Sequence, residues 1–159
     1  MGLPDVPTRL HPEPSADFDS RKLGTTRRTR QWYRVHRVPR GPLFFGKSGG
    51  NRFDAPAGEF GVLYVGADAH CAFIETFGHA TGVRSVTEGE LAVRGMAVIA
   101  CRRPVRLLDL TGKGLARIGA DARLTSGDDY GLSHRWSKAI HEHPSQPDGI
   151  LYRARHDPS

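Results

Sequence analysis

The chain has 159 residues, a formal net charge of +6 and an apolar content of 38%, values that suit one domain with a single core. It contains no run of about 18 apolar residues, and its N-terminus lacks the apolar segment of a secretory signal, so neither a membrane span nor export is expected. The two cysteines, Cys71 and Cys101, are too few for a disulfide framework, and we expect both to be reduced in a cytoplasmic protein.

The first 30 residues are rich in Pro, Asp, Ser and Arg and show little periodicity, which predicts a basic, flexible arm ahead of a domain over residues 31–159. Between Arg21 and Arg40 the chain carries eight Lys or Arg and no acid. Such a block attracts anions, for example nucleic acid, an acidic protein or a phosphate-bearing ligand. A solvated arm without a specific partner accounts for it equally well.

The domain is predicted to begin with a strand at residues 30–38, followed by a long irregular loop over residues 39–61 that is rich in Gly and Pro. Within this loop, Gly46-Lys47-Ser48 resembles the end of a nucleotide-binding P-loop, but the glycine spacing before it is wrong and no helix follows. The glycine-rich backbone, together with Lys47 and Arg52, is still suited to line an anion site.

Farther along the chain, short strands and helices are mixed without regular alternation, which favours an α+β fold. The patterns predict strands at residues 61–66, 95–110 (broken near Pro104) and 148–155, and helices at residues 68–79, 86–94, 112–120 and 131–144, with Asp68 and Thr87 as N-caps.

One acid, Glu75, lies in the apolar part of the helix predicted at residues 68–79. A carboxylate on a buried helix face costs several kcal/mol unless it is paired or used. An ion pair with Arg34 or Arg52 is one explanation for Glu75, and a role in chemistry is compatible with it.

Four histidines occur in the C-terminal part of the chain, at positions 134, 141, 143 and 156. They lack the one-turn spacing of a metalloprotease helix and have no cysteine pair beside them. We therefore interpret them as surface histidines around a helix end and predict no metal site.

Five features in this order and spacing resemble a RES-domain protein over residues 31–159. They are Tyr33-Arg34, Asn51-Arg52-Phe53, Tyr64, Glu75 and the segment at residues 129–158. The resemblance implies a toxin of a bacterial toxin-antitoxin pair that depletes cellular NAD by hydrolysis or phosphorolysis. It also implies an α+β fold similar to that of ADP-ribosyltransferase toxins, with a cleft for NAD. The implied protein partner is a DNA-binding, Xre-like antitoxin, and neither a membrane nor a nucleic acid is an expected direct partner.

The resemblance also suggests roles for individual residues. Glu75 would stabilise the oxocarbenium-like ribose that forms when the nicotinamide–ribose bond breaks. Arg34 and Arg52 would bind the diphosphate or a ribose hydroxyl, and Tyr64 would stack on the nicotinamide. No cofactor or metal is required, because NAD is the substrate and water or inorganic phosphate is the acceptor.

The position of the family's serine is left open. Ser133 is the favoured match, and its hydroxyl would bind a phosphate or the nicotinamide amide. Ser126 is the alternative. Near the chain end, many relatives carry a serine where this sequence has Ala154.

Two other functions also fit the sequence. The first is an ADP-ribosyltransferase that uses NAD to modify a protein. The second is a nucleic-acid-binding module or ribonuclease that uses His36 and the basic block at residues 21–40.

Overall fold

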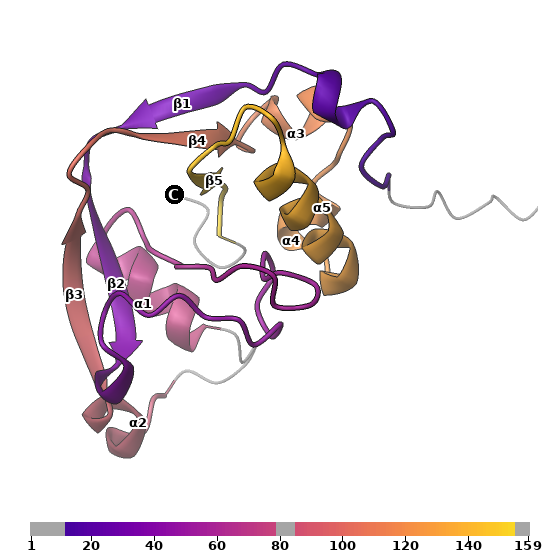
Figure 1. The fold of residues 1–159 in the computed structure, drawn as a ribbon. Coiled ribbons are helices and arrows are strands. Elements are labelled where there is room, and N and C mark those ends of the chain that lie inside the picture. Colours follow the sequence, from indigo (N-terminus) through magenta and orange to yellow (C-terminus); the bar gives the residue numbers. More distant parts are fainter. Residues whose placement is uncertain (1–11, 79–84, 155–159) are drawn as a thin grey trace, which may run out of the picture.

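The computed structural model describes residues 12–78 and 85–154 (Figure 1). Its strands are β1 (Thr25–Arg28), β2 (Gln31–Arg37), β3 (Arg94–Ala100), β4 (Val105–Asp109) and β5 (Gly149–Leu151). Its helices are α1 (Ala69–Phe77), α2 (Glu88–Ala92), α3 (Gly114–Arg117), α4 (Arg123–Ser126) and α5 (Tyr130–Glu142), with 3₁₀ turns at Phe18–Ser20 and Val38–Arg40.

The strands form two small sheets. In one, β4 lies between β1, to which it is antiparallel, and β5, to which it is parallel; in the other, β2 and β3 are antiparallel. Pro104 lies between β3 of the two-stranded sheet and β4 of the three-stranded sheet, directly before β4 begins. Figure 1 shows α1 beside β2, and α3, α4 and α5 beside the other sheet. The mixed architecture confirms the α+β prediction.

The hydrophobic core is built around one face of α5. Leu132, Trp136 and Ile140 recur at a spacing of four and are all buried, and Asp129 caps the helix by accepting a hydrogen bond from the Leu132 amide at 3.1 Å. Residues from β4, α4, the first 3₁₀ turn and the connecting segments complete the cluster: Phe18, Leu23, Phe53, Leu108, Leu110, Ile118, Ala120 and Leu124.

From residue 12 onward, the region predicted to be a flexible arm is packed into the fold. Phe18 and Leu23 lie in the core, and β1 pairs with β4 over residues 25–28. The Trp136 indole donates to the Pro12 carbonyl at 3.0 Å, and Arg135 forms an ion pair with Glu13 at 2.6 Å. No local pattern predicts this burial, because two apolar residues spaced five apart carry no periodicity.

Of the three C-terminal histidines that the structure describes, His143 is not a surface residue, which corrects its prediction; His156 lies outside the described residues. The His143 side chain is buried, and its Nε2 lies 3.2 Å from the Phe18 carbonyl oxygen and 3.1 Å from that of Arg21. Its Nδ1 accepts from the Ser145 amide at 3.0 Å. The ring therefore ties the N-terminal segment to the end of α5.

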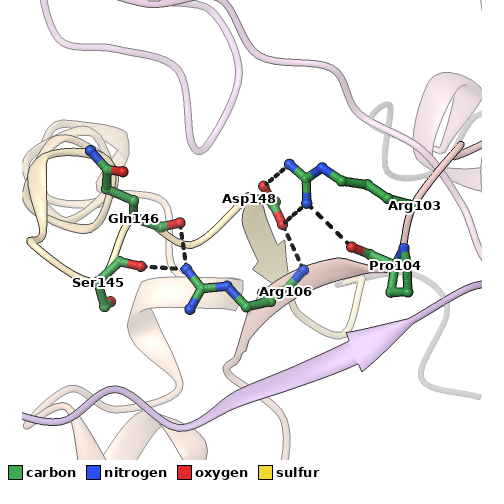
Figure 2. A network of polar contacts seen from close by, with 6 residues as sticks. All are labelled: Arg103, Pro104, Arg106, Ser145, Gln146 and Asp148. Carbon is green, nitrogen blue, oxygen red and sulfur yellow. Dashed lines mark hydrogen bonds and ion pairs between the residues drawn. The ribbon is translucent and has the colours of Figure 1, made fainter.

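A polar network fixes the turn that leads from α5 into β5 (Figure 2). Arg103 binds the Asp148 carboxylate with both terminal nitrogens, at 3.0 and 2.7 Å, and the Arg106 amide donates to the same carboxylate at 2.8 Å. The Arg106 side chain donates to the carbonyls of Ser145 and Gln146. These contacts set the register in which β5 joins β4.

Most predicted elements are present, with shorter boundaries. Asp68 and Thr87 cap α1 and α2 as expected, accepting from the amides of Cys71 and Glu90. The strand predicted at residues 61–66 is wrong, because this segment makes only two isolated bridges, Gly46 with Val62 and Tyr33 with Gly66, to different neighbours. The short α4 and β1 were not predicted. In the part of the chain that the structure describes, no helix is long and apolar enough to cross a membrane.

Candidate active site

A cationic cleft lies between β2 and the irregular loop that follows it. It consists of two adjoining hollows of about 270 and 260 Å³ that share Arg34, Arg40, Phe44 and Asn51. Five of the lining residues are basic and none is acidic; the basic ones are Arg34, Arg37, Arg40, Lys47 and Arg94. Such a surface concentrates anions. Lys47, one of the two residues expected from the sequence to line an anion site, lines the second hollow.

Arg34 lies at the centre of β2 and lines both hollows. Its side chain is half-buried, and its Nη1 is buried without a hydrogen-bond partner among the described residues. Burial lowers the pKa of the guanidinium, because removal from water disfavours the charged form. A buried guanidinium N–H without an acceptor is costly, and an anion in the cleft would supply one.

Tyr64 also lines the cleft, and its hydroxyl is held in place by two bonds. It donates to the Asp54 carboxylate at 3.0 Å and accepts from the Phe53 amide at 2.8 Å. Burial and the neighbouring Asp54 raise the pKa of Tyr64, so the phenol stays neutral. The ring is therefore a fixed part of the cleft wall.

Asp54 is a site residue that the sequence analysis missed. Its side chain is buried, and besides Tyr64 it accepts from the Asn51 amide at 3.1 Å and from the Ser48 hydroxyl at 3.4 Å. One carboxylate thus organises the glycine-rich loop that forms a wall of the cleft. Its position directly after Asn51-Arg52-Phe53 was the available signal.

Glu75 lies on α1 and is half-buried. It has no hydrogen bond or ion pair within residues 12–78 and 85–154, so the predicted pairing with Arg34 or Arg52 is not what the structure shows. Its charge contributes to raising the pKa of Tyr152, after burial as the main cause. Tyr152 also interacts electrostatically with Tyr64, but neither Glu75 nor Tyr152 is among the residues that line the two hollows. Tyr152 was not singled out from the sequence.

Gly66 holds the helix of Glu75 against the strand of Arg34. Its amide donates to the Tyr33 carbonyl at 2.7 Å, and its carbonyl accepts from the Tyr33 amide at 2.9 Å. A Cβ at this position would lie 2.6 Å from the Ala72 nitrogen in α1. Only a glycine allows the two elements to approach so closely.

Arg52 is not among the lining residues of either hollow. It is buried, donates to the Gly127 carbonyl at 2.7 Å, and has its guanidinium carbon 4.8 Å from the centre of the Tyr130 ring. Its second acceptor is the Leu124 carbonyl at 3.5 Å. These contacts join the loop to the end of α4.

Neither predicted serine presents its hydroxyl to the cleft. Ser133 is fully buried in α5 and donates to the Leu124 carbonyl at 3.0 Å, and Ser126 donates to the Ala122 carbonyl at 2.7 Å. The serine that does line the cleft is Ser48, which also accepts from the Gly50 amide at 3.2 Å. Ala154, which follows β5, offers no hydroxyl.

Comparison with known proteins identifies the domain but no individual relative. A family model described as the RES domain matches residues 31–159, which is most of the chain. No curated protein and no solved structure matches.

Proposed function

The chain belongs to the RES-domain family, and from that membership and the site geometry we propose that it is an enzyme that consumes NAD by cleaving the nicotinamide–ribose bond. The observation that carries this proposal is the cleft in which Arg34 keeps a buried, unpartnered N–H beside four other basic residues and no acid. The diphosphate of a dinucleotide is an anion that this donor set recognises.

The reaction needs little from the protein beyond binding and charge. When the C–N bond breaks, its electron pair goes to the pyridinium nitrogen, so nicotinamide leaves as a neutral molecule. The ribose becomes oxocarbenium-like and is captured by an oxygen of water, which then loses a proton, or of inorganic phosphate. The products are ADP-ribose or its 1″-phosphate.

In this proposal the carboxylate of Glu75 stabilises the positive charge on the ribose. Support comes from its half-burial, its lack of a hydrogen bond or ion pair in the described parts of the chain, and its interaction with Tyr152. The rigid ring of Tyr64 stacks on the nicotinamide, and Arg34 holds the diphosphate. Because the Ser133 hydroxyl is already committed to a backbone carbonyl, we assign the serine role to Ser48.

The proposed biological setting is a toxin whose cleft is blocked by a DNA-binding antitoxin. Because the cleft lining is basic, a segment of the partner that plugs the cleft must present carboxylates to Arg34 and its neighbours. The proposal includes a fold similar to that of ADP-ribosyltransferase toxins, and the mixed sheets beside a cleft support it.

The test is to incubate the purified protein with NAD, with and without inorganic phosphate, and to resolve the products by chromatography. We expect nicotinamide release from the native chain and a loss of at least about 100-fold in Glu75→Gln, since a charge-stabilising group is removed from the transition state. Glu90→Gln, an exposed glutamate on α2, is the matched control and should turn over NAD normally.

The second product identifies the acceptor. ADP-ribose indicates water, and a phosphorylated ADP-ribose that needs added phosphate indicates phosphorolysis. Nicotinamide release that requires an added protein, with label retained on that protein, would replace this proposal with an ADP-ribosyltransferase. A native chain that leaves NAD intact under all three conditions would refute it.

A further inference from the structure

Within residues 12–78 and 85–154, no strand pairs with the outer edge of β3. Figure 1 shows β3 at the boundary of the molecule, with β2 between it and α1. Its sheet contains only β2 and β3 among the described residues. The seven-residue strand has no proline, and no charged residue lies between Gly95 and Ala100.

The backbone groups on this edge can be identified from the pairing of β2. Tyr33 exchanges both its backbone bonds with Gly66, on the side of β2 away from β3, while the Val38 amide donates to the Val93 carbonyl. Alternate residues of an antiparallel pair therefore face each other, and the others face outward. On β3, the residues whose N–H and C=O point outward are Arg94, Met96, Val98 and Ala100.

The same edge carries apolar side chains. Met96 and Val98 are 48% and 54% exposed, and Leu91 and Val93, just before the strand, are 46% and 44% exposed. Soluble proteins usually protect an edge strand with lysine, proline or a bulge, because an open apolar edge pairs with other chains. β3 has none of these devices between Gly95 and Ala100, so its edge is suited to pairing.

We propose that this edge is covered by the same edge of a second copy of the chain, in an antiparallel pair of β3 strands about a twofold axis at Ala97. This register sets Met96 opposite Val98 of the second copy, and Arg94 opposite Ala100, so that all four outward-facing residues pair. It is also isologous, as a closed twofold dimer requires.

Charge complementarity is the reason to choose a second copy over another partner. In this antiparallel pair the start of one β3 lies beside the end of the other, so α2, which ends at Ala92, lies at the same end of the pair as Arg102 of the second copy. Glu88 lies one helical turn before Ala92 and on the same side of α2. Arg102 and Glu88 are exposed, and neither has an ion pair in the described parts of the chain. The twofold axis would produce this pairing twice.

The first test is the solution mass of the full chain by light scattering over a range of protein concentrations. We expect a dimer of twice 17.5 kDa that dissociates on dilution. Val98→Asp places a carboxylate at the centre of the interface and should weaken association by at least about 100-fold. Leu43→Asp, at a 63% exposed leucine outside this edge, is the matched control and should leave the dimer intact.

The second test addresses the charges. Glu88→Arg or Arg102→Glu alone should weaken the dimer by about tenfold, and the double variant should restore it, because each reversal then meets its complement. Failure of the double variant to restore association would overturn the proposed orientation. Because thermal unfolding is recorded for each variant, a folding defect is distinguished from lost association.

The third test addresses the register. Ala97→Cys brings two copies of one thiol together across the axis, so oxidation should link the chains. Ala100→Cys places the thiols about 20 Å apart, six strand residues, and should not. Both variants are made with Cys71 and Cys101 replaced by serine. A monomer at every concentration, or crosslinking that does not discriminate between the two positions, would overturn the proposal. Neither result bears on NAD turnover.

Discussion

At the scale of single residues, the site depends on two charged side chains, the buried Asp54 and the half-buried Arg34, which differ in their hydrogen bonding. Asp54 is fully satisfied, since its oxygens accept from Tyr64, Asn51 and Ser48. Arg34 is not, because its Nη1 has no acceptor among the described residues. The hydrogen bonds of Asp54 fix the shape of the cleft. The unpartnered N–H of Arg34 favours the binding of an anion in it.

Replacing Arg34 should therefore impair substrate binding and turnover. Arg34→Gln is expected to lower kcat/KM for NAD by about 10- to 150-fold, the value of a lost charged hydrogen bond, and Arg34→Lys by less, because an ammonium keeps the charge without the planar fork. Steady-state kinetics measures this. The control is Arg27→Gln, at an exposed arginine on β1, which should stay within twofold of the native chain.

Removing the Tyr64 hydroxyl should destabilise the protein as well as the site. Tyr64→Phe leaves the Oδ1 atom of Asp54 and the Phe53 amide without the partner they have in the native chain, at a cost of about 1–3 kcal/mol. Urea unfolding of Tyr64→Phe, Asp54→Asn and the double variant should show coupling of more than about 0.5 kcal/mol. Additive losses would mean that the hydrogen bond contributes nothing. Tyr130→Phe, whose ring lies under Arg52, is the control and should cost less.

At the scale of elements, the position of Glu75 depends on how closely α1 approaches β2. That approach is set by Gly66, which bridges to Tyr33 and has no room for a side chain. The placement of Glu75, and with it the proposed reaction, therefore depends on a strand–helix contact outside the cleft lining.

Gly66→Ala should separate α1 from β2. We expect a loss of about 1–3 kcal/mol in the free energy of unfolding, as for overpacking, and a drop in kcat. Gly89→Ala is a matched control, because nothing lies within 4 Å of a Cβ at that position in α2. It should be neutral or stabilising by up to about 1 kcal/mol, since alanine favours a helix. Equal effects of the two changes would contradict this account.

The turn before β5 should respond to acid. Arg103 and the Arg106 amide lower the pKa of Asp148 from 3.8 to about 2. A lowered pKa in the folded state means that the carboxylate contributes stability above pH 3.8 and loses that contribution as the pH falls toward 2. Because Arg103 is largely exposed, we expect only about 1 kcal/mol at neutral pH, and less at high salt.

Urea unfolding of the native chain and Asp148→Asn checks this expectation. The two proteins should differ at pH 7 and approach each other as the pH falls toward about 2, where the folded-state carboxylate becomes protonated. A difference that persists unchanged in acid would show that Asp148 acts through packing and not through its charge. Asp121→Asn, a carboxylate in an exposed ion pair with Arg123, should make little difference at either pH.

At the scale of the whole molecule, the N-terminal segment is part of the fold. Phe18 packs edge-on against Trp136 and His143, with ring centres 5.4 and 5.2 Å apart, and the His143 ring bonds to the backbone around it. Phe18→Ala should cost about 3–5 kcal/mol, measured by thermal or urea unfolding, because a large cavity opens in the core. The exposed Phe45→Ala should change stability by less than about 1 kcal/mol.

How much of this followed from the sequence depends on the kind of signal. Alternation revealed β2, and caps at Asp68 and Thr87 revealed α1 and α2, because these signals are local. The pairing of β1 with β4 and the burial of Phe18 depend on contacts between distant segments, which no local pattern encodes. The strand predicted at residues 61–66 failed for the same reason, since its residues are apolar but face two different neighbours.

The candidate site was predicted unevenly. Arg34 and Tyr64 line the cleft, since they lie on or beside the strand–loop pair that the motifs identify. Arg52 and Ser133 have the right residue types, yet their donors are directed at carbonyls near α4. Residue type indicates what a side chain is able to bind, whereas its direction is decided by packing, and this is why Asp54 and Ser48 emerged only from the structure.

The burial of Phe18 has a practical consequence for expression. The RES-domain match begins at residue 31, so a fragment cut to that boundary would lack Phe18, Leu23 and β1. It would leave Trp136 and the edge of β4 open to solvent, and both invite aggregation. A poorly soluble fragment of this kind would say nothing about activity, because the fragment lacks part of the hydrophobic core.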